Sequence, residues 1–327
     1  MSENNEKAMR ILVTGGSGFI GANLVKYFID RNIEIQNIDV VPPTLIPSQE
    51  SSWVQQDILD AEGLKKTFED FSPTHVIHMA ARTDLEEEND INGYSANIQG
   101  VENVLNAAKL PSVERVIIIS SMLVCEPGYL PKDDLDFKPN TLYGESKVET
   151  EKAVRKQQLP YSWCIVRPAV IWGPHHLRLL DGFFKIMRKG LYFHPGASQA
   201  KRSYGYVGNS VYQLDKLLQV EETAIAGKVF YLTDPPINLH EWVNGFSRLF
   251  HGRDVRNIPG FILQAAGLVG DMLEKIGIHK FPMNSFRYRN MTANNIVPTE
   301  AISEVVGPLP YTMQQGIAET VDWIKEN

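Results

Sequence analysis

Residues 10–21 read Arg-Ile-Leu-Val-Thr-Gly-Gly-Ser-Gly-Phe-Ile-Gly, an apolar strand that runs directly into a glycine-rich turn. Gly16 and Gly18 allow a sharp turn and let the backbone approach a pyrophosphate, and Gly21 lets the following helix pack closely against the strand. The amides at the N-terminus of that helix would face the anion. An amphipathic run follows the turn, which is the context that a glycine pattern of this kind requires. The segment predicts a site for a dinucleotide cofactor.

The next predicted strand, residues 33–39, ends in an acid. Asp39 lies 18 residues after Gly21, where an acidic side chain can accept hydrogen bonds from the adenosine ribose. Residues 40–43 are Val-Val-Pro-Pro, so no nearby cation would offset a 2′-phosphate. The pattern therefore favours NAD over NADP.

The composition and charge of the 327 residues limit the partners and the cellular location that we expect for the protein. The net charge is −7 and there is no block of lysine or arginine, which argues against nucleic acid or an anionic membrane as partner. Residues 1–9 lack the apolar segment of a secretory signal, and the apolar window 261–269 is too short to span a bilayer. We expect a cytoplasmic protein. Cys125 and Cys164 fit no metal or redox spacing, so buried free thiols are expected and no metal site.

Short β-branched runs alternate with helical patterns as far as residue 174, and two of the helices are expected over residues 61–71 and about 91–109. Such runs suit strands that are buried on both faces, and repeated strand–helix units imply a parallel, doubly wound Rossmann sheet with right-handed crossovers. The expected fold class is α/β, with a smaller, mostly C-terminal α/β lobe for substrate. We expect the nucleotide-binding domain over 8–174, rejoined by about 204–234, and the substrate lobe over 175–203 and 235–327.

Tyr143 and Lys147 are four residues apart at the start of a predicted helix, so both side chains project from one face. An ammonium near a phenol favours the phenolate, which can take or return a hydroxyl proton during hydride transfer. Tyr212 and Lys216 repeat the spacing, but they lie beyond the point where the alternation of strands and helices breaks. The first pair follows a strand that ends in Ser120-Ser121, at the ligand edge of the sheet.

Taken together, the glycine turn, His78-Met79-Ala80-Ala81, Ser120-Ser121 and Tyr143-Gly144-Glu145-Ser146-Lys147 resemble the extended short-chain dehydrogenase/reductase family over at least residues 9–235. The resemblance implies that Ser121 hydrogen-bonds the reacting substrate oxygen, that Tyr143 is the acid/base and that Lys147 contacts the nicotinamide ribose. It implies a helix asparagine, Asn97, that stabilises the backbone of the active site. The cofactor residues it implies are Gly15, Gly18, Phe19, Ile20, Gly21, Asp39, Asp57, Ile58, Ala80, Ala81, Tyr143 and Lys147. His78 is expected to bond within the sheet.

Residues 202–209 resemble a segment of the nucleotide-sugar members of this family. Arg202 in that segment suits a diphosphate, because a guanidinium stays charged and can bond in a bidentate manner. Arg287 and Arg289 are candidates for a second cation. The sequence departs from the pattern of the nucleotide-sugar members at two places that bear on the substrate. Val170 replaces an asparagine that many sugar-nucleotide members carry, and its surroundings also resemble the hydroxysteroid dehydrogenase branch. Residues 122–123 are Met-Leu where dehydratases have Asp-Glu, which argues against dehydration.

The first functional hypothesis is an NAD-dependent enzyme that transfers hydride reversibly at a secondary alcohol of a nucleotide sugar, at C4, as an epimerase or a ketoreductase. The alternative is a hydroxysteroid-type or other apolar alcohol dehydrogenase. A third reading, an NAD-binding regulator without catalysis, is disfavoured because both Tyr143 and Lys147 are present. The resemblance also implies a homodimer through the Tyr143 helix and its neighbour.

Overall fold

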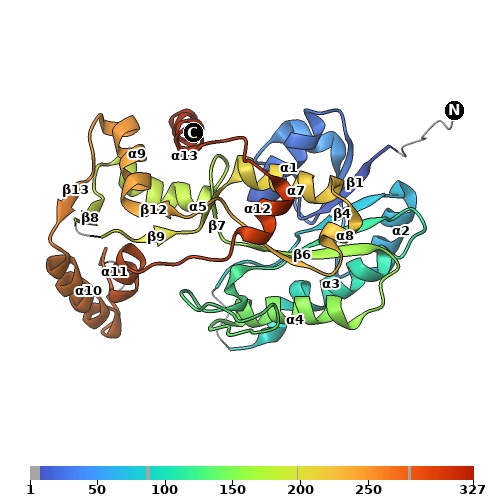
Figure 1. The fold of residues 1–327 in the computed structure, drawn as a ribbon, viewed down its shortest axis with the longest axis horizontal. Helices are drawn as coiled ribbons and strands as arrows, with labels where there is room; N and C mark the ends of the chain where they lie inside the picture. The colour runs from blue at the N-terminus through green and yellow to red at the C-terminus, as the bar shows by residue number, and fades with distance from the viewer. Residues whose placement is uncertain (1–7, 86–88, 197, 279–280) are drawn as a thin grey trace. The chain divides into compact units, whose positions relative to one another are not determined.

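The computed structural model describes residues 8–85, 89–196, 198–278 and 281–327 (Figure 1). The chain divides into two compact units. Unit 1 comprises residues up to Ala169, Val207–Leu232 and Pro298–Pro310, and unit 2 comprises Val170–Tyr206, Thr233–Val297 and Tyr311–Asn327.

Unit 1 is built on a seven-stranded sheet in the order β11-β6-β5-β4-β1-β2-β3, in which every neighbouring pair is parallel. The α/β fold with a doubly wound parallel sheet is thus confirmed. Its elements are β1 Arg10–Thr14, α1 Phe19–Ile29, β2 Glu34–Asp39, η1 Pro47–Ser52, β3 Trp53–Gln55, α2 Ala61–Phe71, β4 His75–His78, η2 Ile91–Tyr94, α3 Ser95–Ala107, β5 Arg115–Ile119, η3 Met122–Val124, α4 Leu142–Lys156, β6 Ser162–Pro168, α7 Val207–Gln219, α8 Glu222–Ile225, β11 Val229–Leu232 and α12 Glu300–Val306.

Helices cover both faces of this sheet. One core cluster places α1 and α7 against one face, with residues such as Leu24 and Leu214 fully buried. The other places α2 and α3 against the opposite face through Phe68 and Val104. Because both faces are covered, the central strands are mostly apolar, and all five residues of β5 are buried.

Unit 2 contains three two-stranded ladders, β10-β7, β12-β9 and β13-β8, surrounded by helices. Its elements are β7 Val170–Trp172, α5 Leu177–Leu179, the π-helix η4 Leu180–Phe184, α6 Lys185–Arg188, β8 Phe193–Pro195, β9 Lys201–Arg202, β10 Tyr204–Tyr206, β12 Ile237–Asn238, α9 Leu239–His251, β13 Arg256–Ile258, α10 Gly260–Lys275, α11 Ser285–Thr292 and α13 Met313–Glu326. Its core is aromatic: the ring of Trp172 lies 5.6 Å from that of Trp242 and 5.1 Å from that of Tyr206, between ring centroids.

The division of the chain differs from the expected one in three places. Unit 2 begins at Val170 rather than after residue 174, because β7 pairs with β10. For the same reason β10 belongs to unit 2, and the return to unit 1 begins at Val207. Residues 298–310, expected in the substrate lobe, belong to unit 1, because α12 buries Ile302 and Val306 in the core beside the sheet.

Candidate active site

The glycine turn after β1 is fixed by close backbone contacts. Gly15 has a φ of +76°, and a Cβ there would lie 2.6 Å from the backbone of Ala80, so only glycine fits. A Cβ on Gly21 would collide with the carbonyl oxygen of Gly15. We expected Gly16 to make the turn. The left-handed residue is Gly15 instead, whereas Gly16 is needed because a side chain there would collide with Asn37.

The turn suits a pyrophosphate. Gly18 is the N-cap residue of α1 and has no side chain to accept hydrogen bonds from the amides of the first turn. A Cβ on Gly18 would meet only the Gly15 carbonyl oxygen, at 3.4 Å, so the outer side of the loop is open to a ligand. Phe19 and Ile20 follow and are half-buried. The donor set and the shape of the loop therefore fit the diphosphate of a dinucleotide.

Asp39 ends β2 beside this turn. Its Oδ2 accepts a hydrogen bond from the Ser17 amide at 3.1 Å, and its Oδ1 accepts one from the Val41 amide at 3.3 Å. Burial raises the pKa of this carboxyl, and the hydrogen bonds from the backbone of Val41 and Ser17 oppose that effect. The carboxylate is thus oriented at the end of its strand, where the ribose contact is predicted.

Two further predicted cofactor positions follow β3. Asp57 is exposed, and its Oδ1 accepts a hydrogen bond from the Leu59 amide at 2.8 Å. The Ile58 side chain is buried at 5% exposure and packs against Gly100 of α3, where a Cβ on the glycine would lie only 2.5 Å away. The side chain of Ile58 therefore anchors the loop in the core.

A hydrogen-bond cluster holds Ala80 and Ala81 after β4. The Thr14 hydroxyl oxygen accepts the amides of Met79 at 3.2 Å and Ala80 at 3.1 Å, and it lies 2.8 Å from His78 Nδ1. Because the oxygen already accepts hydrogen bonds from two amides, we assign the hydroxyl as the donor in the hydrogen bond to His78 Nδ1. Burial, with Lys147 nearby, lowers the pKa of His78 to about 3, so the ring is neutral. The expectation that His78 bonds within the sheet is confirmed.

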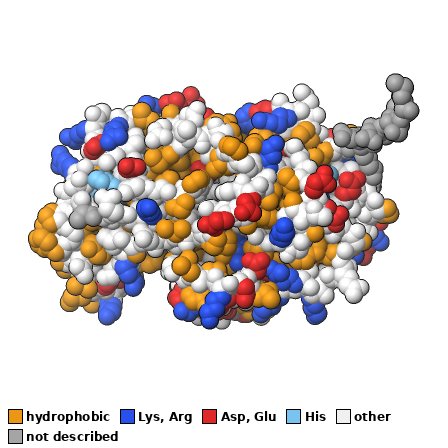
Figure 2. Space-filling model, viewed as in Figure 1, with side chains coloured by type: hydrophobic (Ala, Val, Ile, Leu, Met, Phe, Trp, Pro, Cys, Tyr) orange, Lys and Arg blue, Asp and Glu red, His pale blue; other side chains and the backbone are white. Residues whose placement is uncertain are grey.

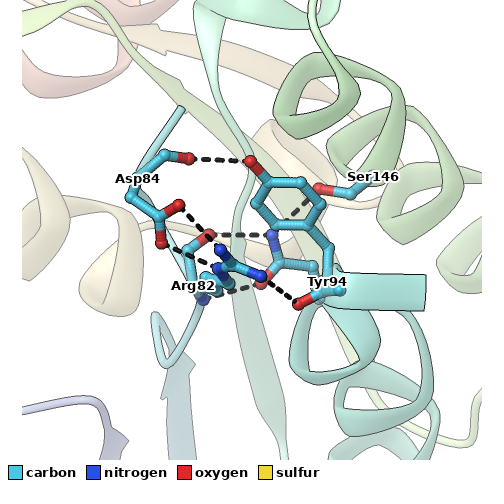
Figure 3. A network of polar contacts seen from close by, with 6 residues as sticks. Arg82, Asp84, Tyr94 and Ser146 are labelled. Carbon is cyan, nitrogen blue, oxygen red and sulfur yellow. Dashed lines mark hydrogen bonds and ion pairs between the residues drawn. The ribbon is translucent and has the colours of Figure 1, made fainter. Parts of the chain in front are cut away.

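Asn97 of α3 fixes the next stretch of backbone (Figure 3). Its Oδ1 accepts the Arg82 amide at 2.8 Å, and its Nδ2 donates to the Arg82 carbonyl at 3.0 Å and to the Ser146 hydroxyl at 2.9 Å. Ser146 in turn donates to the Tyr143 carbonyl at 2.7 Å. Asn97 thus links the loop after β4 to the first turn of α4.

The same loop carries an ion pair that the sequence did not reveal. Arg82 bonds the carboxylate of Asp84 at 2.8 and 3.0 Å and the Gly93 carbonyl at 2.9 Å, and the Tyr94 hydroxyl donates to the Asp84 carbonyl at 2.9 Å (Figure 3). The Tyr94 ring is fully buried, with its centroid 6.1 Å from that of Tyr143. The network therefore packs against the predicted acid/base.

Tyr143 and Lys147 lie one turn apart in the first half of α4, which begins at an N-cap formed by Thr141. Lys147 is 3% exposed, and its Nζ donates to the Ile119 carbonyl at the end of β5, at 3.0 Å. Burial lowers the pKa of Lys147 to about 8, opposed by the charge of Glu151. The carboxyl end of β5 and the buried face of α4 thus hold an ammonium one helical turn from a phenol.

Ser120 and Ser121, which follow β5, have different partners. The Ser121 hydroxyl accepts the Leu123 amide at 3.1 Å and caps η3. Ser120 donates to Glu151 Oε1 at 2.7 Å. The hydroxyl of Ser121 retains its proton for donation, whereas that of Ser120 is committed to a buried carboxylate.

Glu151 completes a buried ion pair one turn beyond Lys147. Arg167 of β6 bonds both carboxylate oxygens of Glu151 at 2.8 Å, and both side chains are at most 1% exposed. Arg167 also donates to the Tyr231 hydroxyl at 3.1 Å. Sequence analysis missed Glu151, although its spacing of four from Lys147 and eight from Tyr143 places all three on one helix face.

Arg202 lies in β9 of unit 2 and is 4% exposed. Its Nη2 donates to the Asn290 carbonyl, and its Nε has no partner among the described residues. Burial lowers the pKa of this guanidinium, opposed by Tyr204 and Tyr192. The other two candidate cations, Arg287 and Arg289, are exposed on α11. Val170 is 40% exposed at the start of β7.

Both cysteines are free and buried, as expected. Among the described residues no group of histidine, cysteine, aspartate and glutamate is arranged to hold a metal ion. None of the helices in the described part of the chain has the length and apolar character that crossing a membrane requires.

Comparison with known proteins places the chain among cofactor-dependent enzymes. Residues 11–232 match the NAD dependent epimerase/dehydratase family. The chain is 29% identical to a 3 beta-hydroxysteroid dehydrogenase/Delta 5→4-isomerase of Mycobacterium tuberculosis over 71% of this chain and 67% of that protein. It is 25% identical to the N-acetyl-alpha-D-glucosaminyl-diphospho-ditrans,octacis-undecaprenol 4-epimerase of Escherichia coli O157:H7, over 96% of this chain and 94% of that protein.

A solved structure supports the fold. The UDP-glucose 4-epimerase of Thermotoga maritima superimposes with a TM-score of 0.73 over 97% of this chain and 99% of that one, at 18% identity. The family match covers more than half of the chain and includes the glycine turn and the Tyr143–Lys147 pair. The chain therefore belongs to the NAD-dependent epimerase/dehydratase family and is an NAD-dependent enzyme of the extended short-chain dehydrogenase/reductase type.

Proposed function

We propose that this enzyme transfers hydride reversibly at a secondary alcohol of a nucleotide sugar, at C4, as an epimerase or a ketoreductase. The observation that carries the chemistry is the buried ammonium of Lys147, held at the end of β5 one turn from Tyr143. The observation that supports a diphosphate-bearing substrate is the buried guanidinium of Arg202, whose Nε has no partner within the described part of the chain.

Each of the three proposed catalytic residues has a separate task. NAD, when bound, accepts the hydride from the carbinol carbon and can return it to the carbonyl carbon. Tyr143 takes the hydroxyl proton as the alcohol is oxidised and returns it on reduction. Lys147 favours the phenolate through its positive charge, and the charge of Glu151 opposes the loss of that proton on burial. Ser121 donates a hydrogen bond to the reacting oxygen and so stabilises the charge that develops there.

The same residues serve both net reactions. If the ketone is reduced on its other face before it leaves, the result is epimerisation without net consumption of NAD. If the ketone leaves, the result is dehydrogenation. Dehydration is disfavoured because Met122 and Leu123, which follow Ser121, have no side chain that can transfer a proton.

A second candidate function is oxidation or reduction of an apolar alcohol such as a steroid. The exposed Val170 of β7 stands where an amide would contact a sugar nucleotide, and it offers only an apolar surface. The Mycobacterium relative, whose name gives a hydroxysteroid activity, also favours this candidate.

Thermal unfolding of the purified protein with ligands distinguishes the two candidates. A ligand that binds only the folded state raises its stability by mass action. We expect NAD to raise the melting temperature and one nucleotide among UDP, GDP, CDP and dTDP to raise it further at equal concentration. If NAD stabilises the protein, no diphosphate adds to it and a hydroxysteroid does, the apolar-alcohol candidate replaces the first.

A further inference from the structure

The carboxylate that ends β2 is closed into a circle of hydrogen bonds. Asp39 Oδ2 accepts the Ser17 amide at 3.1 Å, and Asp39 Oδ1 accepts the Val41 amide at 3.3 Å. The circle closes because the Ser17 hydroxyl donates to the Val41 carbonyl at 2.8 Å. The glycine turn after β1 is therefore joined to the end of β2 both directly and through the carboxylate. We call Ser17, Asp39 and Val41 the Asp39 clasp.

A buried side chain of β2 supports the clasp. Asn37 is fully buried, and its Nδ2 donates to the Ser17 hydroxyl at 3.1 Å. The single proton of that hydroxyl goes to Val41, so the hydroxyl oxygen must accept from Asn37. Asn37 Oδ1 has no partner among the described residues, which makes the amide a costly group to bury. An apolar side chain would fill the position without that cost, and the bond to Ser17 is what the asparagine adds.

The main chain of Asp39 is held as firmly as its carboxylate. The Asp39 carbonyl accepts hydrogen bonds from the Gln56 amide at 3.2 Å and from Trp53 Nε1 at 3.3 Å. Rotating the side chain away would break its bonds to the amides of Ser17 and Val41. Burial raises the pKa of the carboxyl, but these two amides lower it and so favour the charged form. The end of β2 thus presents a carboxylate in one fixed orientation.

A fixed carboxylate at this place distinguishes two dinucleotides. It can accept hydrogen bonds from the ribose hydroxyls of NAD, whereas the 2′-phosphate of NADP would bring a like charge against it. A carboxylate that could rotate would turn away from the phosphate, but the clasp opposes that rotation. Val40 and Val41 are each 53% exposed and carry no compensating charge. On the face that Figure 2 shows, acidic side chains lie among the basic ones over unit 1, so no broad basic area is seen there.

We propose that Ser17 and Asn37 determine the choice of cofactor: they hold Asp39 against the glycine turn and so exclude NADP. Both act through Asp39 and are therefore positioning residues. The proposal rests on the predicted contact between Asp39 and the adenosine ribose, and it is independent of the substrate and of the chemistry of Tyr143. It adds the reason why a single acid can discriminate, which is that the acid has no other orientation to adopt.

Calorimetric titration of the full-length protein with NAD and with NADP tests this without using turnover. We expect the wild type to bind NAD about 100-fold or more tightly than NADP, because the like charges meet at close range. Ser17→Ala opens the clasp and should narrow that ratio by about tenfold, the worth of about one hydrogen bond. The change should come from tighter binding of NADP, since the Asp39 carboxylate remains available to NAD.

Ser17→Ala leaves the buried amide of Asn37 without a partner, so a second variant removes both groups. The double variant Ser17→Ala, Asn37→Leu buries no unpaired amide, and it should melt at or above the temperature of Ser17→Ala while keeping the narrowed ratio. A merely structural role would instead weaken the binding of NAD and NADP alike. Ser52→Ala is the matched control: it removes a serine hydroxyl of the same unit that donates to the Gln49 carbonyl in η1, and it should keep the wild-type ratio.

Asp39→Ala separates the two ways in which the proposal can fail. It should narrow the ratio more than Ser17→Ala does, because it removes the charge itself. If Asp39→Ala leaves the ratio unchanged, the ribose contact is wrongly assigned and the proposal falls with it. If Asp39→Ala narrows the ratio but Ser17→Ala and the double variant do not, the ribose contact stands and the positioning role is wrong. A wild type that binds NADP as tightly as NAD would also overturn the proposal.

Discussion

Buried polar groups are satisfied differently in two neighbourhoods, one around Glu151 in unit 1 and one around β8, β9 and α9 in unit 2. In unit 1, Glu151, Arg167, Ser120 and Tyr231 bond one another with almost no exposure. In unit 2, the neighbourhood of β8, β9 and α9 has buried side-chain nitrogens without a partner among the described residues. These are His194 Nε2, Arg202 Nε, His240 Nε2 and Trp242 Nε1.

The difference indicates a division of tasks. The groups around Lys147 are fixed by the protein itself, so the fold sets their charge and position before any substrate arrives. The unpartnered groups of unit 2 gain a hydrogen bond only from a ligand or water, and a buried donor or acceptor without one costs about 1–3 kcal/mol. His194 and His240 are stacked with ring centroids 4.4 Å apart, and burial, with His240 nearby, lowers the pKa of His194 to about 4. We infer that unit 1 determines the chemistry and unit 2 the substrate.

The sharpest test of the chemistry assigned to unit 1 compares two tyrosines of that unit with the same spacing to a lysine. Tyr143→Phe should lower kcat about 10³-fold, because it removes the proton carrier, and should leave NAD affinity near normal. Tyr212→Phe removes a hydroxyl on α7 that lies 3.5 Å from the Val306 carbonyl of α12, and the variant should keep full turnover. Steady-state kinetics and NAD titration measure both. Equal loss in the two variants would contradict the assignment.

The second test concerns the buried ion pair. Glu151→Gln should reduce the free energy of unfolding by about 3 kcal/mol, because Arg167 would keep its charge in the core without a counter-ion. Glu149→Gln breaks the exposed pair with Lys152 on the same helix and should cost less than about 0.5 kcal/mol. Denaturant unfolding of both variants measures the difference. A small change in Glu151→Gln would mean that the unit 1 network is not closed in the way described.

The third test concerns Arg202. Arg202→Gln should weaken binding of the stabilising nucleoside diphosphate by about tenfold or more, roughly 1.4 kcal/mol, with NAD affinity unchanged. Arg202→Lys keeps the charge but loses the planar guanidinium, so its affinity for the diphosphate should lie between those of the wild type and Arg202→Gln. Arg253→Gln, which changes an exposed arginine of the same unit, serves as the matched control. Calorimetric titration of the folded proteins gives the affinities, and undiminished binding in Arg202→Gln would remove the diphosphate role.

The smallest expected effect is a pH dependence of stability. Burial lowers the folded-state pKa of Lys147 to about 8, below its usual value of about 10.4, so the unfolded chain binds more protons between these values. Stability contributed by this lysine is lowest below pH 8 and rises as the pH increases through the window, by about 1 kcal/mol between pH 8 and pH 9.

Urea unfolding of the wild type and of Lys147→Met at several pH values isolates this contribution, since all other groups are common to both. The rise in the free energy of unfolding between about pH 8 and pH 9 should be missing in Lys147→Met. A difference between the two proteins that does not change with pH would show that the ammonium is solvated rather than buried.

The sheet of unit 1 was predictable because its central strands are mostly apolar and the turn after β1 carries glycines in a fixed pattern. The predicted helix over residues 61–71 matches α2 exactly in its bounds. The helix expected over residues 91–109 begins instead as the 3-10 turn η2, capped by Asp90, before α3 starts at Ser95. Periodicity locates a helix, but side-chain hydrogen bonds at its ends decide where it begins.

The candidate site was predictable where one helix face carries it. Tyr143, Lys147 and the glycine turn follow from local spacing. The Arg82–Asp84 pair and the contact of Glu151 with Arg167 could not be predicted in this way. The first lies in an irregular loop, and the second joins a helix to a strand, so no periodic pattern in the sequence encodes either contact. The substrate lobe was least predictable, since its ladders are two or three residues long and have no periodicity to read.

The return of residues 298–310 to unit 1 has a consequence for how the protein is made. The chain changes unit after Ala169, Tyr206, Leu232, Val297 and Pro310, so neither unit is a continuous piece. During synthesis, unit 1 lacks α12, and with it Ile302 and Val306 of its core, until residue 306 has left the ribosome. Truncation before residue 298 should therefore yield a protein that aggregates rather than a working nucleotide-binding domain.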